Sequence, residues 1–455
     1  MSAADVAGLA PPAILLAGAA VVALFERVLP ADERVKRWLA AAIATAAVVI
    51  AAMSGPGGDA FDGAIRRDAA ALLFTILIAG AVVAVLLLDA ADERATDAWS
   101  PALMLSAAAG AVLVACAGDL VLLLVALEIA IASQLATIAR VGRPGAARAY
   151  FVWGASASTF VGIGIVLLVS ASGTTALGSL GTVDATVARA GIALVLAGLA
   201  CVAALAPFHL WLAPAVSALS SAGALFITTV LRIAALAALL RCAAAITSSS
   251  DAAVDWRACL AVLAAATVAV GAIAALTESS LRRLLSYLSI AYIGQVAVAA
   301  ASGIGGSAAV AFAIAVFVPL MVGSFAVVES LPADEPAVED LRGIARRRPA
   351  LGAALAMLLF GLAGAPPTVG FFARLAIFES AVDAQLAWLM FIAAGATVAS
   401  ATAAARVAFT CLDAGAGGTL RSRTATALAL GTAALVLIGG VVPGPLLELA
   451  RGIRF

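Results

Sequence analysis

Charged side chains inside apolar segments are the residues of this sequence with the strongest claim to chemistry. Glu128 lies within the run 121–139, Arg232 lies midway through 222–240, and Arg374 follows two consecutive prolines in the run 350–379. A carboxylate or guanidinium at the depth of a bilayer costs several kcal/mol unless it is paired or hydrated. Such residues therefore indicate either an ion pair that joins two helices or positions along a hydrated path for ions.

His209 is the single histidine and lies two residues before Trp211. Its imidazole can change charge near neutral pH. A histidine beside a tryptophan at a helix end is also typical of an anchor at the membrane surface. Other polar residues in apolar runs can hold water or form hydrogen bonds between helices; these are Gln134, Tyr287, Tyr292 and Gln295.

The elements that position these residues follow from the composition. The chain has 455 residues, of which 65% are hydrophobic and only 11% charged, too few to surround a water-soluble core. The apolar runs show no period-two alternation of the kind found in a β-barrel. The sequence predicts an all-α polytopic membrane protein with about fourteen transmembrane helices. They fall near residues 6–25, 38–54, 69–88, 101–117, 119–139, 149–170, 188–206, 215–243, 256–277, 283–300, 305–329, 350–379, 384–411 and 424–445.

Pro366 and Pro367 predict an interruption of the helix that carries Arg374. A proline supplies no backbone N–H and clashes with the preceding helical turn. Broken helices at membrane depth line cavities in transporters. We therefore expect a break at residues 365–367 that faces a cavity.

Several classes of function are excluded. The 26 Lys and Arg residues balance 26 Asp and Glu residues, so no basic excess argues for a nucleic-acid partner. The five cysteines are far apart and have no CxxC spacing, which disfavours a metal or haem site. The sequence has no P-loop, dinucleotide fingerprint or nucleophile elbow. A self-contained enzyme is not expected, and the driving force must come from an ion gradient or from partner subunits.

The charge distribution predicts the orientation. The run 6–25 is long for a cleaved signal peptide, so we expect it to be a retained first helix. Most of the Lys and Arg residues, Arg94 and Arg143 among them, fall in alternate loops. The positive-inside rule then places both termini outside.

Several stretches match one family in order. They are 118–128 with Glu128, 149–158, 207–211 with His209, 232–241, 282–291, and 361–374 with the paired prolines and Arg374, the last being the most specific. They resemble the antiporter-like membrane subunits of respiratory complex I, a proton-conducting membrane transporter family. Residues 149–158 are most similar to its subunit N branch.

The resemblance implies two inverted five-helix repeats. It divides the chain into N-terminal helices (1–117), a proton-translocation core (118–411) and a C-terminal helix with a tail (412–455). It implies a non-redox subunit in the bacterial inner membrane that moves protons when quinone is reduced elsewhere in the complex. NAD, FMN, iron–sulfur clusters and quinone would be held by partner subunits. The partners would be homologous antiporter-like subunits, small membrane subunits and the lipid bilayer.

The sequence differs from the family at its lysines. By spacing from His209, the seventh-helix lysine falls at Val202, while the eighth- and twelfth-helix lysines fall at Arg232 and Arg374. Arginine does not readily release its proton. We therefore expect both arginines to act as fixed charges that bias Glu128, His209 or water chains, and Glu128 to face the bundle interior near Val202. A monovalent cation/proton antiporter or membrane-bound hydrogenase subunit, and a structural subunit that no longer pumps, are the alternatives.

Overall fold

The computed structural model describes residues 2–28, 33–90, 100–140, 144–178, 186–246, 250–333, 336–415 and 421–453. Arg94 and Arg143, which contribute to the predicted orientation, lie outside these ranges. The first nine helices are α1 (Ala3–Val28), α2 (Glu33–Ser54), α3 (Ala69–Ala90), α4 (Pro101–Cys116), α5 (Leu120–Arg140), α6 (Pro144–Ser172), α7 (Thr186–Ala203), α8 (Leu212–Ala218) and α9 (Ser221–Ile246). They are followed by α10 (Ser250–Thr277), α11 (Leu281–Ala301), α12 (Ser307–Ser330), α13 (Ile344–Arg347), α14 (Pro349–Ala363), α15 (Val369–Asp383), α16 (Ala387–Leu412), α17 (Arg423–Val441) and α18 (Gly444–Arg451). Short 3-10 helices are η2 (Phe208–Trp211), η3 (Gly303–Gly306) and η4 (Val338–Leu341).

The predicted all-α membrane fold is confirmed. Twelve spans in the described ranges are long and apolar enough to cross a bilayer, with α7, η2 and α8 forming one of them. The shorter apolar helices α4 and α14 supply the remaining crossings, and α15 continues the crossing begun by α14. Runs of Leu, Val and Ala favour the helix because every backbone polar group is satisfied within the segment.

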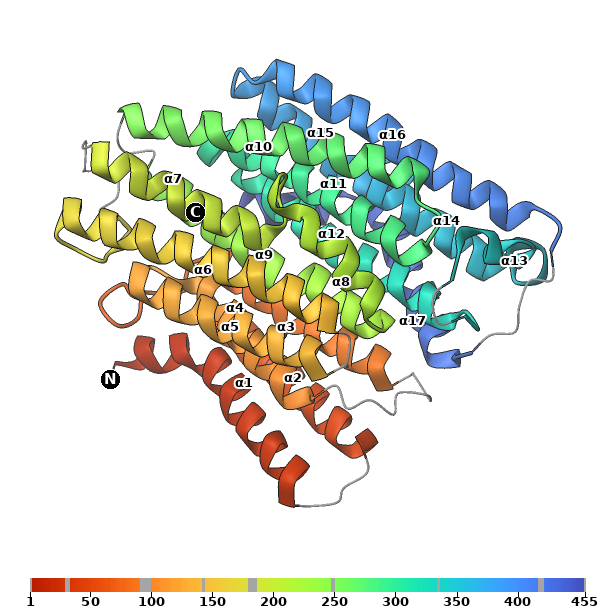
Figure 1. Cartoon of the computed structure of the whole chain (residues 1–455), viewed down its shortest axis with the longest axis horizontal. Helices are drawn as coiled ribbons and strands as arrows, with labels where there is room; N and C mark the ends of the chain where they lie inside the picture. Colours follow the sequence, from red (N-terminus) through yellow and green to blue (C-terminus); the bar gives the residue numbers. More distant parts are fainter. Residues whose placement is uncertain are drawn as a thin grey trace.

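The helices lie side by side with α9 in the middle of the bundle. In Figure 1, α1 and α2 lie along one edge, α16 lies along the opposite edge, and α9 and α12 lie between them. The apolar window of α9 is buried on all sides, and this helix packs against α3, α4, α7 and α12. A helix that is hydrophobic all round belongs in the interior. Arg232 therefore reaches the core because it is part of the central helix.

The chain contains an internal duplication. An isolated backbone bridge joins Asp119 to Ala176, and another joins Ser280 to Ala337, the same number of residues later at both ends. The close packing of Gly110 on the backbone of α5 recurs at Gly271, which lies against the backbone of α11. The first repeat has the five crossings α4, α5, α6, α7 with α8, and α9, and the second has α10, α11, α12, α14 with α15, and α16. Because five is an odd number, the second repeat runs through the membrane inverted with respect to the first.

Each repeat contains one broken crossing, and we call these the first break and the second break. At the first break, α7 ends before Ala204, which has a φ of 56°, and a cis Ala206–Pro207 bond precedes η2. At the second break, α14 ends before Gly364, which has a φ of 82°, and a cis Pro366–Pro367 bond precedes α15. A left-handed residue just after the last turn is a common way to end a helix. The predicted break at 365–367 is confirmed, whereas the first break was not predicted.

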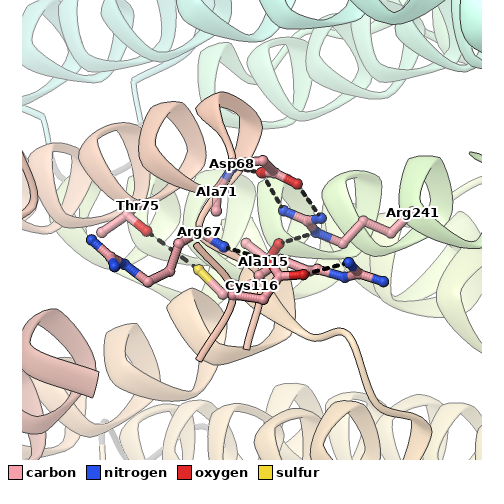
Figure 2. A network of polar contacts seen from close by, with 9 residues as sticks. Arg67, Asp68, Ala71, Thr75, Ala115, Cys116 and Arg241 are labelled. Carbon is pink, nitrogen blue, oxygen red and sulfur yellow. Dashed lines mark hydrogen bonds and ion pairs between the residues drawn. The ribbon is translucent and has the colours of Figure 1, made fainter. Parts of the chain in front are cut away.

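A polar network ties α9 to the start of α3 and the end of α4. Figure 2 shows the Arg241 guanidinium forming two hydrogen bonds of 2.8 Å with the Asp68 carboxylate and one of 2.6 Å with the Ala115 carbonyl. Burial alone would raise the pKa of Asp68, but the hydrogen bonds and positive charge of Arg241 outweigh it and hold the pKa below its ordinary value. Asp68 is therefore ionised at neutral pH and fixes this end of α9.

Candidate functional site

Arg232 of α9 is fully buried at the first break. Its Nε donates a hydrogen bond of 3.0 Å to the carbonyl of Ala203, the last residue of α7. Its Nη1 donates to the Thr228 carbonyl at 3.3 Å and to the Ser289 hydroxyl at 2.9 Å. The carbonyls at a helix C-terminus lack intrahelical partners and carry partial negative charge. The guanidinium therefore caps the end of α7, and no carboxylate in the described part of the chain pairs with it.

Arg374 of α15 does the same at the second break. Its Nη2 donates hydrogen bonds to the carbonyls of Leu362 and Ala363, the last two residues of α14, at 3.0 and 3.4 Å. Its Cζ lies 5.3 Å from the centroid of the Tyr292 ring, in a cation–π contact. The side chain is only 4% exposed. Both arginines thus bind the end of the first half of a broken helix, although Arg232 lies on the crossing that follows its break and Arg374 lies on the second half of the broken crossing itself.

A small cavity lies beside Arg232, between α5, α6, α7 and α9. Val202 lines it, so the position where the family carries a lysine does face an internal space. The Tyr150 hydroxyl donates a hydrogen bond of 2.6 Å to Gln134 Oε1. Gln134 Nε2 and Arg232 Nη2 are buried and have no hydrogen-bond partner in the described structure. The cavity therefore presents two unsatisfied donors.

The prediction that Glu128 faces the bundle interior is wrong. Glu128 is exposed, on the same side of α5 as Val121 and Val125, while Leu127 and Gln134 are buried. Residues three and seven positions apart share a helix face, so the orientation of α5 sends Glu128 away from Val202. In the described part of the chain no residue forms a hydrogen bond or ion pair with it. The structure does not bring Glu128 and Arg232 together.

His209 lies in η2, directly after the first break, and is half-buried. Its Nδ1 is buried without a partner, and its side chain forms no hydrogen bond with any residue that the structure describes. The adjacent Leu210 is 62% exposed. His209 therefore lies near the surface of the bundle, and among the described residues no hydrogen bond joins its side chain to Arg232 or Arg374.

The second break differs from the expected one in the side chains that surround it. Pro366 and Pro367 are exposed, so the prolines point away from the interior. The unsatisfied carbonyls of α14 point inward, where Arg374 binds them and occupies the space. The Arg374 side chain thus fills the side of the break next to α14, and the expected cavity is found at Val369, the first residue of α15, which lines an apolar cavity together with residues of α3, α12, α17 and α18.

Tyr150 is a functional candidate that the sequence reasoning missed. It is one of only three tyrosines, and it lies in an apolar helix. A buried phenol usually finds a hydrogen-bond partner. The need of the Tyr150 hydroxyl for a partner, together with the presence of Gln134 in the preceding helix, could have predicted this hydrogen bond from the sequence.

The sequence is similar to known membrane proteins over most of its length. Residues 117–400 match a family model described as NADH:quinone oxidoreductase/Mrp antiporter, TM. The NADH-quinone oxidoreductase subunit N of Deinococcus radiodurans is 33% identical, over 75% of this chain and 72% of that protein. Subunit N 1 of Streptomyces griseus is also 33% identical, over 98% of this chain and 97% of that protein.

Solved structures resemble the whole chain. A chain of respiratory complex I from Thermus thermophilus superposes with a TM-score of 0.85 at 29% identity, covering 97% of this chain and all of that one. A chain of the Mrp complex from Dietzia has a TM-score of 0.84 at 21% identity, over 99% of this chain and 97% of that one. The second likeness concerns the fold alone.

Proposed function

The chain belongs to the NADH:quinone oxidoreductase/Mrp antiporter family of membrane proteins, and from this premise we propose that it is subunit N of a bacterial NADH:quinone oxidoreductase. It is a proton-translocating membrane subunit that works together with other membrane subunits of the same complex. The similarity to subunit N over nearly the whole chain is the observation that carries this assignment. The redox groups, NAD, FMN, iron–sulfur clusters and quinone, belong to partner subunits.

Arg232 and Arg374 act in this subunit as fixed positive charges. A guanidinium stays protonated, so neither side chain can take up and release a proton in turn. Each is held by carbonyl groups at the end of a half-helix. A fixed charge at such a position lowers the proton affinity of nearby groups and orients nearby water. Protons pass beside the arginines, along water and polar side chains such as Gln134 and Tyr150.

Glu128 enters the proton path at a contact with another membrane subunit. Its carboxylate lies on the outer side of α5, within an apolar helix. Leaving it against lipid would cost several kcal/mol. This side of α5, which includes Val121 and Val125, is therefore covered in the assembled complex. His209, near the surface at the first break, is the second titratable group of the path.

The test is proton translocation by the assembled complex in sealed vesicles. NADH oxidation is measured in parallel with acidification of the lumen, and Glu128→Gln is compared with Glu128→Asp. We expect the Gln variant to lower the number of protons moved per NADH and the Asp variant to retain most of it. Equal pumping by both variants and wild type would favour a structural subunit. Pumping that requires sodium would favour the cation/proton antiporter.

We further propose that both termini lie outside the cytoplasm, because an even number of crossings puts them on one side and the basic loops lie on the other. A cysteine introduced at Ser2 should react with a membrane-impermeant maleimide applied to spheroplasts, over the background of the unmodified chain. Labelling only after lysis would reverse the orientation.

A further inference from the structure

The cavity at the first break is built to receive an acceptor. Arg232 is 0% exposed and Gln134 is 1% exposed, and each leaves one NH₂ group without a hydrogen-bond partner. Both residues line the cavity. The Tyr150 hydroxyl adds no third donor, because its hydrogen is used on Gln134 Oε1. An occupant that accepts hydrogen bonds would therefore satisfy both groups at once.

The charge at this site is not balanced. The described residues that line the cavity include no Asp or Glu, and the contacts of Arg232 are two carbonyls and one hydroxyl. Carbonyl dipoles offset only part of a full positive charge. A buried guanidinium cannot become neutral by losing its proton. An isolated buried charge is strongly unfavourable unless it is paired.

The size and walls of the cavity limit what it can hold. Its free space admits about one water-sized particle. Carboxylic acids and phosphate are therefore too large. Ile131, Val202, Ile227 and Leu231 contribute apolar walls, which suit an anion that sheds its hydration readily.

We propose that this cavity binds one small monovalent anion of the halide class, such as chloride, as the counterion of Arg232. Arg232 Nη2 and Gln134 Nε2 donate hydrogen bonds to it from different helices. The anion supplies the negative charge that no side chain supplies here. The site adjoins the proton path proposed above, because Gln134 and Tyr150 line the same cavity, but anion binding can be measured whether or not the subunit pumps.

Arg374 provides the matched comparison within the same chain. Its charge lies over the face of Tyr292, and its Nη2 binds two carbonyls. The negative face of an aromatic ring offsets part of a cation's charge. The Nε and Nη1 of Arg374 are also buried without a hydrogen-bond partner, so the second break differs from the first in this ring contact and not in having every donor satisfied.

The first experiment measures the thermal stability of the assembled complex in chloride and in gluconate at constant ionic strength, after preparation without chloride. Binding to the native state raises the unfolding temperature in a saturable way. We expect chloride to raise the melting temperature of this subunit by a few degrees. Bromide should substitute for chloride and gluconate should not.

Two variants make the test specific. Gln134→Glu places a carboxylate beside Arg232, so it should remove the dependence on chloride while the subunit still assembles. Arg374→Lys should keep the dependence, because it leaves the first break intact. If wild type is equally stable in both salts, the cavity holds water and the proposal fails.

The second experiment locates the ion. Crystals of the assembled complex grown in bromide should show an anomalous peak between Arg232 and Gln134, and crystals of the Gln134→Glu variant should not. A stabilising effect of chloride that survives in Gln134→Glu, with no peak in the cavity, would assign the effect to another part of the complex.

Discussion

The two broken helices share a backbone design but differ in how each is capped. Both end in a left-handed residue, Ala204 or Gly364, and both leave carbonyls without intrahelical partners. At the first break the cap comes from a different helix, α9, and a cavity remains beside it. At the second break the cap, Arg374, comes from the second half of the same broken helix and stacks on Tyr292. The unpaired carbonyls are therefore capped by an arginine in two ways, and at the first break a small cavity remains beside the guanidinium.

The largest effect is expected from Arg232→Ala. This change leaves the Ala203 carbonyl and the Ser289 hydroxyl without their partner and enlarges the cavity. Each buried polar group left without a partner costs about 1–3 kcal/mol, so the total loss of stability should be about 3–5 kcal/mol. We expect little assembled complex and strongly reduced ΔpH formation, with electron transfer measured in parallel. Arg232→Lys, which restores the charge, should assemble and retain or raise proton translocation.

A smaller effect is expected from Arg374→Ala. The cap of α14 and the cation–π contact are lost, but the prolines of this break already face outward. Loss of the hydrogen bonds and the ring contact should cost about 2–3 kcal/mol. Assembly should persist at a lower level, with reduced ΔpH formation that Arg374→Lys restores. If this variant assembles less well than Arg232→Ala, the ranking of the two breaks is wrong. If both alanine variants pump like wild type, the arginines serve packing alone.

The next largest effect is a dependence of stability on pH, and it concerns the polar network that ties α9 to α3 and α4. Folding lowers the pKa of Asp68 below its ordinary value of 3.8, so the ion pair with Arg241 contributes stability at any pH above that ordinary value. That contribution is lost as the pH falls below 3.8 through the folded-state pKa. The Asp68→Asn variant should lose less stability than wild type over this acidic range, as measured by thermal unfolding of the complex. An identical acid dependence in both proteins would contradict the role of this ion pair.

The smallest effects are expected from removing single hydroxyl groups. Tyr150→Phe breaks the hydrogen bond to Gln134, and Tyr292→Phe breaks the one to the Ala313 carbonyl, so each should cost about 1 kcal/mol of stability. Only Tyr150→Phe should change chloride affinity, because it frees Gln134 Oε1 beside the cavity. In Tyr292→Phe the aromatic ring would still lie against Arg374. A loss of chloride dependence in Tyr292→Phe would show that the two breaks are not independent sites.

The helix count and the second break could be predicted from the sequence because both follow from local chemistry. An apolar run must form a helix in a bilayer, and Pro366 with Pro367 removes two donors in succession. The first break has a single proline, Pro207, at this point, and its left-handed residue is Ala204, which gives no signal of its own.

The contacts of the site could not be predicted in the same way. Both sides of α5 are mostly apolar, although the side that faces the bundle also carries Ser133, Gln134 and Thr137. Where both environments favour apolar residues, the pattern does not fix the rotation of a helix about its axis. The acceptor of Arg232 depends on how α7 and α9 pack, which no local motif encodes.

The hydrogen bond from Arg232 to Ser289 connects α9 of the first repeat directly to α11 of the second. Ser289 lies on α11, and Tyr292, which supports Arg374, follows it on the same helix about 4.5 Å further along the axis. The Arg232 guanidinium therefore contacts α7, α9 and α11. The same α11 carries Tyr292, whose ring contacts the Arg374 guanidinium. If α11 slid along its axis or turned about it, the contacts of both arginines would change together. A displacement that begins in one repeat would therefore reach the other repeat through this helix.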